Sequence, residues 1–187
     1  MILYLDTSAL IKRYVVEAGS NEVVALIEQA ETVSPVLLTR VEMAAGLSRA
    51  ARMNWVDSGD AESAWQDFLA HWQSFTRLSV TTALAERAGR LAWEYGLRGY
   101  DATHLAAALL WQETLEMPVT LATYDRELWL AGQKAGGLAC RAGILNPVFG
   151  NKNVWGFFLR DTSIGDLPIL ILRLERTKID CLPRISS

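Results

Sequence analysis

Cysteine is scarce in this chain of 187 residues, which contains only Cys140 and Cys181. Two cysteines so far apart in sequence provide neither a disulfide framework nor the short spacing of a structural zinc site. Small secreted folds that depend on disulfides are therefore disfavoured, and the composition is typical of a protein from a reducing compartment. We expect a cytoplasmic location.

Long apolar runs are also missing. The apolar start of the chain, Met1–Leu5, is ended by Asp6. The basic residues Lys12 and Arg13 follow this run instead of preceding it, which disfavours a signal peptide. No uncharged stretch reaches the ~18 residues that a membrane-spanning helix needs. The sequence therefore predicts no membrane span.

An excess of basic charge is missing as well, because the formal net charge is -3 at pH 7. Nucleic-acid-binding proteins are often basic, so this balance weighs against such a function. Bound metal ions reverse the sign of an acidic site, however, and an acidic nuclease holds RNA through a local basic rim. The hydrophobic content of 51% predicts a folded domain with a substantial core.

Short β segments alternate with helices along the first 147 residues. An apolar run cut off by Asp6 predicts a strand at 1–5, and further short strands are predicted at 32–36, where Pro35 breaks the segment, and at 77–80, 118–123 and 138–140. Apolar residues at helical spacing predict helices that begin near 9, 19, 37, 57, 82, 102 and 126. This alternation indicates an α/β domain with a parallel sheet.

The composition changes after Pro147. Helical periodicity stops, and isolated glycines, aromatic residues and basic residues replace it. We interpret residues 148–187 as an irregular C-terminal appendage of unknown role, attached to a complete domain of residues 1–147. Its one candidate strand is Leu167–Leu174, and truncation after Gly150 is expected to leave a folded domain.

Four acidic residues stand out by position. Asp6 follows the first predicted strand, and Asp125 comes just after the strand at 118–123. Asp101 begins a helix, and Glu42 lies in an apolar stretch. Ligands bind at the carboxyl ends of parallel strands, and clustered carboxylates need a cation such as Mg²⁺ or Mn²⁺. Helix capping by the aspartates and a solvated position for Glu42 are the alternatives, and position alone leaves both open.

Four motifs, in matching order and spacing, resemble those of PIN domains and in particular the VapC-like toxins. The first two are YLDTSAL at residues 4–10 and RVEMA at 40–44. The third, RGYDATHLA at 98–106, is the most specific, and the fourth is LATYDREL at 121–128. The resemblance covers roughly residues 1–147, and the long tail departs from the family pattern.

The resemblance implies a three-layer α/β/α sandwich around a short parallel sheet. It also implies a Mg²⁺- or Mn²⁺-dependent endoribonuclease that cleaves single-stranded RNA as the toxin of a type II toxin–antitoxin pair. The implied catalytic and metal-binding acids are Asp6, Glu42, Asp101 and Asp125, with Thr7 and Thr123 as helper hydroxyls. The implied partner is a small VapB-like antitoxin whose C-terminal segment lies along apolar helices and reaches the acidic pocket with an arginine. Helices 37–54 and 57–75 are the expected groove, because they carry surplus apolar residues.

Several other residues have competing interpretations. The basic residues near the acidic motifs are candidates for RNA phosphate contacts, with ordinary surface charge as the alternative: Arg13, Arg40, Arg98 and Arg126. His104 shares a helix face with Asp101, but a packed or hydrogen-bonded histidine fits better than a general base. His71 and the helical tryptophans are interpreted as packing residues, and Ser8 lacks partners for a nucleophilic triad.

Two other functions stay open from the sequence. One is a catalytically inert PIN-like domain that binds RNA or a protein. The other is a general RNA-processing nuclease without an antitoxin. Exposed apolar helices further favour a homodimer.

Overall fold

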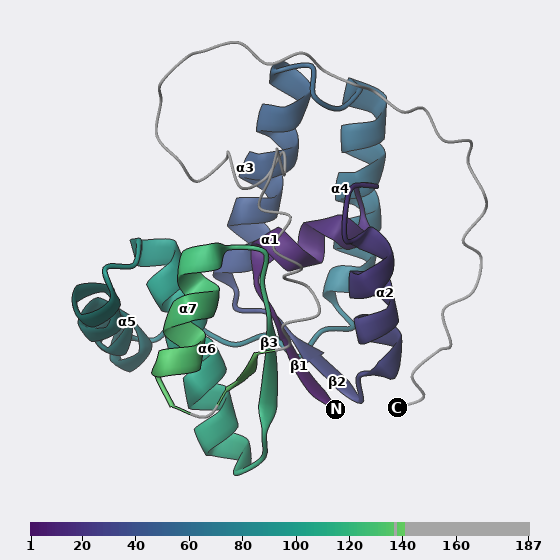
Figure 1. Cartoon of the computed structure of the whole chain (residues 1–187). Helices are drawn as coiled ribbons and strands as arrows, with labels where there is room; N and C mark the ends of the chain where they lie inside the picture. Colours follow the sequence, from purple (N-terminus) through teal and green to yellow (C-terminus); the bar gives the residue numbers. More distant parts are fainter. Residues whose placement is uncertain (137, 141–187) are drawn as a thin grey trace.

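The computed structural model describes residues 1–136 and 138–140 (Figure 1). Four strands form one sheet: β1 (Ile2–Leu5), β2 (Thr32–Ser34), β3 (Val119–Ala122) and β4 (Ala139–Cys140). Their order is β2-β1-β3-β4, and every pairing is parallel. Because all strands run the same way, their carboxyl ends meet at one edge, where ligands bind in sheets of this kind.

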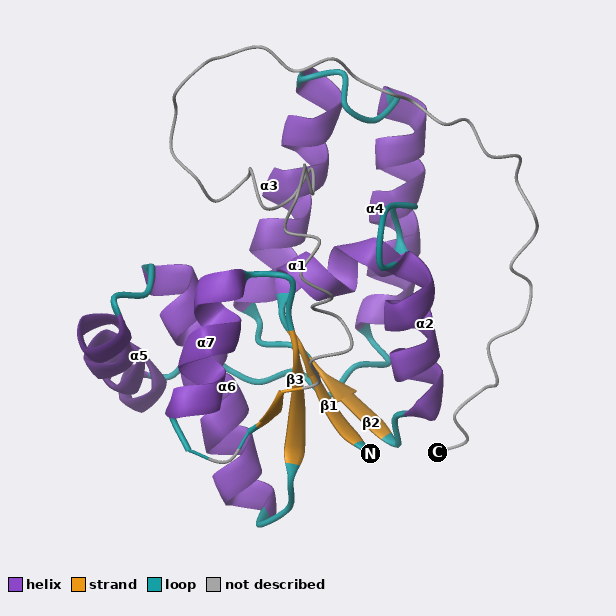
Figure 2. Ribbon diagram, viewed as in Figure 1, coloured by secondary structure: helices purple, strands orange, loops and turns teal. Residues whose placement is uncertain are grey.

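Helices cover both faces of this sheet (Figure 2). In chain order they are α1 (Thr7–Leu10), the 3₁₀ turn η1 (Ile11–Arg13), α2 (Ser20–Gln29), α3 (Leu38–Arg52), α4 (Ser58–Trp72), α5 (Thr82–Tyr95), α6 (Gly99–Leu115) and α7 (Arg126–Lys134). Helices α5, α6 and α7 lie on one side, and α2 lies on the other. The pair α3 and α4 extends beyond the carboxyl edge of the strands (Figure 1).

The two faces of β1 explain this layering. Successive side chains of a strand point to opposite faces. Ile2 and Tyr4 pack in the core beneath α5, α6 and α7, whereas Leu3 and Leu5 pack in the core with α1, α2, α3 and α4. All four side chains are buried, so the short run stabilises both cores at about 1.5–3 kcal/mol per large apolar side chain. The three-layer α/β/α prediction is confirmed.

Two local predictions differ from the structure. The predicted strand at 77–80 is wrong, since only Leu78 forms an isolated bridge, with Val36. Arg77 and Val80 are exposed, so only one residue of this segment packs inward. Helix α6 begins at Gly99, three residues before the predicted start. The extra turn includes Asp101, which is buried within the helix.

No helix among residues 1–136 is long and apolar enough to cross a membrane. The predicted appendage at 148–187, with its candidate strand Leu167–Leu174, lies outside the described residues.

Candidate active site at the carboxyl end of the sheet

The pairing of β1 with β3 brings two distant motifs together. Leu5 lies opposite Ala122 in the sheet, and the next residue, Asp6, donates its backbone N–H to the carbonyl of Ala122 at 3.1 Å. Thr123 follows Ala122 directly, and its hydroxyl donates to Asp6 Oδ2 at 2.9 Å. The predicted acid and the predicted helper hydroxyl are therefore in contact although 117 residues separate them.

Asp6 is held firmly in place. It is 4% exposed, and it caps α1 by accepting hydrogen bonds from the backbone N–H groups of Thr7 at 2.7 Å and Ser8 at 3.3 Å. The Ser8 hydroxyl also donates to Asp6 Oδ2. Asp6 is thus an N-cap, and it also lies at the edge where a ligand would bind. Asp6 therefore caps a helix, as the alternative interpretation proposed, and this role is compatible with a role in ligand binding.

Glu42 reaches the same place from α3. Its Oε2 accepts a hydrogen bond from the Thr7 hydroxyl at 2.6 Å and lies 2.8 Å from Nε2 of His104. The same nitrogen lies 3.3 Å from Asp6 Oδ1. The other ring nitrogen, Nδ1, lies 3.0 Å from the Tyr4 hydroxyl. His104 of α6 therefore contacts two of the predicted acids at once.

These contacts determine the protonation state of His104. The ring is fully buried, and burial disfavours the imidazolium. The charge of Asp6 and the hydrogen bond to Glu42 outweigh burial and raise the pKa of His104 to about 9. For Glu42, burial likewise opposes ionisation, but His104 and Thr7 leave its pKa below the ordinary value. The pair is therefore an imidazolium beside a carboxylate at neutral pH.

Asp101 is a buried acid with a hydrogen-bond acceptor left unsatisfied by the described residues. It is 2% exposed, and its Oδ2 has no hydrogen-bond partner in the described part of the chain. Burial, followed by the charges of Asp125 and Asp6, raises the pKa of Asp101 to about 7, against a smaller opposing effect of Arg98 and His104. Asp101 is therefore close enough to Asp6 and Asp125 for their negative charges to disfavour its ionised form, an effect that a bound cation would offset.

Asp125 lies nearer the solvent. It caps α7, because its Oδ1 accepts from the N–H groups of Glu127 at 2.8 Å and Leu128 at 2.9 Å. Its own N–H donates to Thr123 Oγ1 at 3.0 Å. Asp125 is half-buried and acts on Asp101 through its charge. This position suits an acid that acts through a water molecule.

The donor set fits a hard divalent cation. It consists of carboxylate and hydroxyl oxygens, which Mg²⁺ and Mn²⁺ prefer, and one buried carboxylate oxygen of Asp101 is without a partner. Among the described residues, no three acidic, histidine or cysteine side chains are so placed that they could together hold a metal ion, so the acids would have to move closer to bind one. His104 Nε2 contacts Asp6 Oδ1 and Glu42 Oε2, so an ion bound to either of these two oxygens would replace that contact.

The four predicted arginines are spread more widely. Arg98, the N-cap residue of α6, is close enough to lower the pKa of Asp101, and its Nη1 is buried without a hydrogen-bond partner among the described residues. Arg40 and Arg126 are exposed and lie close in sequence to Glu42 and Asp125. Arg13 lies against the Tyr14 ring, with its guanidinium carbon 5.9 Å from the ring centre. Its role at the site stays a prediction.

Sequence reasoning missed Ser8. Its hydroxyl accepts from the N–H of Tyr124 at 2.9 Å and donates to Asp6, so it bridges the first and fourth motifs. The sequence feature that could have indicated Ser8 is its position two residues after an N-cap aspartate, where side-chain hydrogen bonds between neighbouring residues are common. His104 is buried and hydrogen-bonded, in agreement with its interpretation, but its partners are the predicted catalytic acids.

Comparisons with known proteins place this geometry in a family. The PIN domain family model matches residues 3–130. Two curated proteins of Mycobacterium tuberculosis, Ribonuclease VapC45 (strain CDC 1551 / Oshkosh) and Ribonuclease VapC49 (strain ATCC 25618 / H37Rv), are each 33% identical to this chain over 138 residues. Each alignment covers 72% of this chain and 92% of the relative.

Solved structures share the fold. PAE2754 from Pyrobaculum aerophilum has a TM-score of 0.52 at 23% identity, covering 78% of this chain and 88% of that one. VapC20 of Mycobacterium tuberculosis, a toxin described as cleaving the sarcin–ricin loop, has a TM-score of 0.51 at 17% identity, covering 74% and 98%. With the matched family model and the curated relatives, these findings show that the chain belongs to the PIN domain family.

Proposed function

We propose that this chain is a divalent-metal-dependent endoribonuclease that cleaves single-stranded RNA and is the toxin of a type II toxin–antitoxin pair. The observation that carries this proposal is the group of acids at the carboxyl edge of the sheet, of which Asp6 and Asp101 are buried, and above all the Asp101 Oδ2 atom, which has no hydrogen-bond partner in the described part of the chain. The curated relatives, both named as VapC ribonucleases, support the same activity.

The acids have different tasks in this proposal. Asp6 and Asp101 would hold the ion directly, Glu42 would hold it or orient water, and Asp125 would act through water. A bound Mg²⁺ or Mn²⁺ lowers the pKa of water and polarises the scissile phosphate. The hydroxyls of Thr7, Ser8 and Thr123 orient the carboxylates of Glu42 and Asp6 by direct hydrogen bonds.

RNA phosphates would be held by a local basic rim. Arg40 lies in α3, Arg98 is the N-cap residue of α6 and Arg126 begins α7, so each is close in sequence to one of the predicted acids. Arg98 is the strongest candidate, because it is already near Asp101 and has a buried guanidinium nitrogen without a partner among the described residues. Contacts of this kind weaken as salt rises.

The first prediction tests the activity itself. The protein is expected to cleave single-stranded RNA with Mg²⁺ or Mn²⁺ and to lose cleavage in EDTA. The Asp6→Asn variant should be at least ~100-fold slower, since even outer-shell changes at metal sites cost 10–100-fold. Product length on a sequencing gel is the measurement.

The matched control is Glu127→Gln, which neutralises an exposed acid two residues after Asp125. This variant should cleave at the wild-type rate. RNA binding without cleavage would identify an inert PIN-like domain instead, and cleavage that persists in EDTA would exclude the metal-dependent mechanism.

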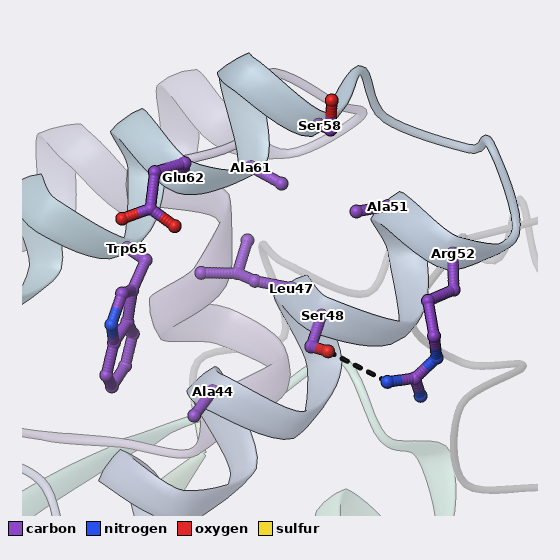
Figure 3. A pocket seen from close by; sticks show the side chains of 9 residues that line it. All are labelled: Ala44, Leu47, Ser48, Ala51, Arg52, Ser58, Ala61, Glu62 and Trp65. Atoms are coloured by element: carbon purple, nitrogen blue, oxygen red, sulfur yellow. Dashed lines mark hydrogen bonds between the residues drawn. The ribbon is translucent and has the colours of Figure 1, made fainter.

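A groove between α3 and α4 is the proposed site for the antitoxin (Figure 3). It encloses about 390 Å³, and its lining includes Leu47, Ala51, Ala61 and Trp65, with Glu62 and Arg52 as charged members. Figure 3 shows Leu47 and Ala51 of α3 facing the labelled residues of α4, whereas Arg52 points toward Ser48 of its own helix. The same helix, α3, carries Glu42 of the acidic site. In this proposal the antitoxin segment extends from the groove to that site, where its arginine would pair with the carboxylates.

The second prediction tests this partner. Co-expression with the adjacent upstream reading frame should yield a stable complex at micromolar concentrations. Ala51→Glu, which places a charge in the groove, should weaken the complex at least ~10-fold, equivalent to 1.4 kcal/mol. Ala83→Glu, on the exposed side of α5, is the control and should leave affinity unchanged.

Calorimetric titration measures both affinities. Separate elution of the two proteins, or equal binding by the Ala51→Glu variant, would contradict the proposed groove. If the protein cleaves RNA but the upstream reading frame encodes no protein that binds it, a general RNA-processing nuclease is favoured. The expected homodimer stays a prediction.

A further inference from the structure

A buried positive charge lies behind the acidic site. Lys12 of η1 is 2% exposed, which is rare for lysine. Its Nζ donates to Glu17 at 2.6 Å and to the carbonyl of Ala18 at 2.9 Å. The same Nζ lies 4.1 Å from the centre of the Tyr124 ring, within cation–π range. A buried charge is costly unless such contacts compensate for lost water, and the four acids do not account for its presence.

Tyr124 is also held from a second direction. Its hydroxyl donates to the carbonyl of Gly19 at 3.1 Å. Gly19 has a φ of +91°, and a Cβ added there would lie 2.1 Å from the tyrosine oxygen. Only glycine therefore allows the loop before α2 to approach this ring so closely. The ring is enclosed by that loop and by Lys12.

The backbone of Tyr124 connects this enclosure to the acids. Its N–H donates to Ser8 Oγ at 2.9 Å, and the Ser8 hydroxyl donates to Asp6 Oδ2. On its N-terminal side, Thr123 donates to the same oxygen of Asp6 at 2.9 Å. On its C-terminal side, the next residue is Asp125. A shift of the Tyr124 ring would therefore change the surroundings of two predicted metal-site acids.

We propose that Lys12 and Tyr124 are positioning residues that set the metal affinity of this site. Lys12 fixes the Tyr124 ring, and the Tyr124 N–H then holds Ser8 against Asp6, beside the neighbouring Thr123. The inference rests on the proposed metal-dependent function. Mg²⁺ demands near-ideal octahedral geometry, so a small rotation of the Asp6 carboxylate weakens binding. Removing such outer-shell support typically costs 10–100-fold in metal affinity.

The test measures Mn²⁺ binding to the full chain by electron paramagnetic resonance, without RNA. The double variant Lys12→Met, Glu17→Gln removes both charges of the buried pair and leaves neither unpaired. It should bind Mn²⁺ about 10-fold more weakly, as should Tyr124→Leu, which removes the ring but keeps the backbone N–H. Tyr124→Phe keeps the ring beside Lys12 and should stay within about threefold of wild type.

A structural control separates positioning from stability. Leu26→Ala removes a buried side chain of α2, in the same core as Leu3 and Leu5. It should lower the melting temperature while leaving Mn²⁺ affinity unchanged. In addition, combining the Lys12→Met, Glu17→Gln variant with Tyr124→Leu should weaken binding no further than either alone, because both act through one ring.

The outcomes distinguish a failure of the proposed metal-dependent function from a failure of the positioning role of Lys12 and Tyr124. If wild type binds no Mn²⁺, the proposed metal-dependent function fails. If wild type binds but the Lys12 and Tyr124→Leu variants bind equally well, only the positioning role is overturned. Additive losses in the combined variant, or an equal loss in Leu26→Ala, also overturn it. If Tyr124→Leu does not fold, the Lys12 variant compared with Leu26→Ala still decides the matter.

Discussion

Replacing Asp101 by asparagine is expected to remove nuclease activity and yet stabilise the metal-free protein. The native pKa of Asp101 is raised to about 7 by burial and by the charges of Asp125 and Asp6. At pH 8 the native state therefore keeps a charge that its surroundings oppose, at about 1.4 kcal/mol per pKa unit. Asparagine has the same shape without this charge, so we expect a gain on the order of 2 kcal/mol.

Thermal melting and cleavage rate on the same variant test both halves of this expectation. The melting temperature in EDTA at pH 8 should rise by about 5 °C, while cleavage with Mg²⁺ should fall at least ~100-fold. The matched control is Asp57→Asn, because Asp57 caps α4 through Gly59 in a helix that carries none of the predicted acids. A net fall in the stability of Asp101→Asn would show that Asp101 mainly supports its helix.

Stability in EDTA is expected to fall as the pH rises from 5 to 9. The native pKa of Asp101 is raised from 3.8 to about 7, so between these two pH values the native state holds a proton that the unfolded chain has lost, and stability falls as the pH rises. The native pKa of His104 is raised from 6.5 to about 9. Its stabilising contribution is complete below pH 6.5 and is lost as the pH passes 9. Both groups therefore act in the same direction.

Mg²⁺ should reverse much of this loss above pH 7. The ion would replace the proton on Asp101 as the compensating charge, and any ligand of the native state stabilises it by mass action. Melting curves at intervals from pH 5 to 9, with Mg²⁺ or EDTA, measure the effect. Asp101→Asn should flatten the lower half of the EDTA profile and His104→Gln the upper half. A flat wild-type profile would be inconsistent with clustered charges at this site.

The strands that carry the site were predictable because their signal is local. Ile2–Leu5 is wholly apolar and Val119–Ala122 is apolar except for Thr120; all these residues are buried, and each segment is followed closely by a polar capping residue. The segment 77–80 instead alternates polar and apolar residues, and only Leu78 bridges Val36. Its other residues gain too little burial for a strand to form, and this depends on tertiary packing that no local pattern contains.

The site itself was predictable only in part. The motifs pointed to the acids, but the hydrogen bond from Tyr124 to Ser8 spans 116 residues and follows from the β1–β3 pairing. Lys12 likewise had no distinguishing pattern, because a lysine in a short helix is ordinarily solvated. Its burial is a result of the loop that ends at Gly19, which folds over it.

The adjacency of β1 and β3 also has a consequence for synthesis of the chain. The first strand leaves the ribosome early, but its neighbour in the centre of the sheet ends at Ala122. A nascent chain that still lacks β3 has neither Thr123 nor Asp125, and it lacks the Tyr124 N–H that donates to Ser8. The acids therefore assemble only after nearly the whole domain has emerged. An unfinished polypeptide is thus expected to be harmless to the messenger from which it is being translated.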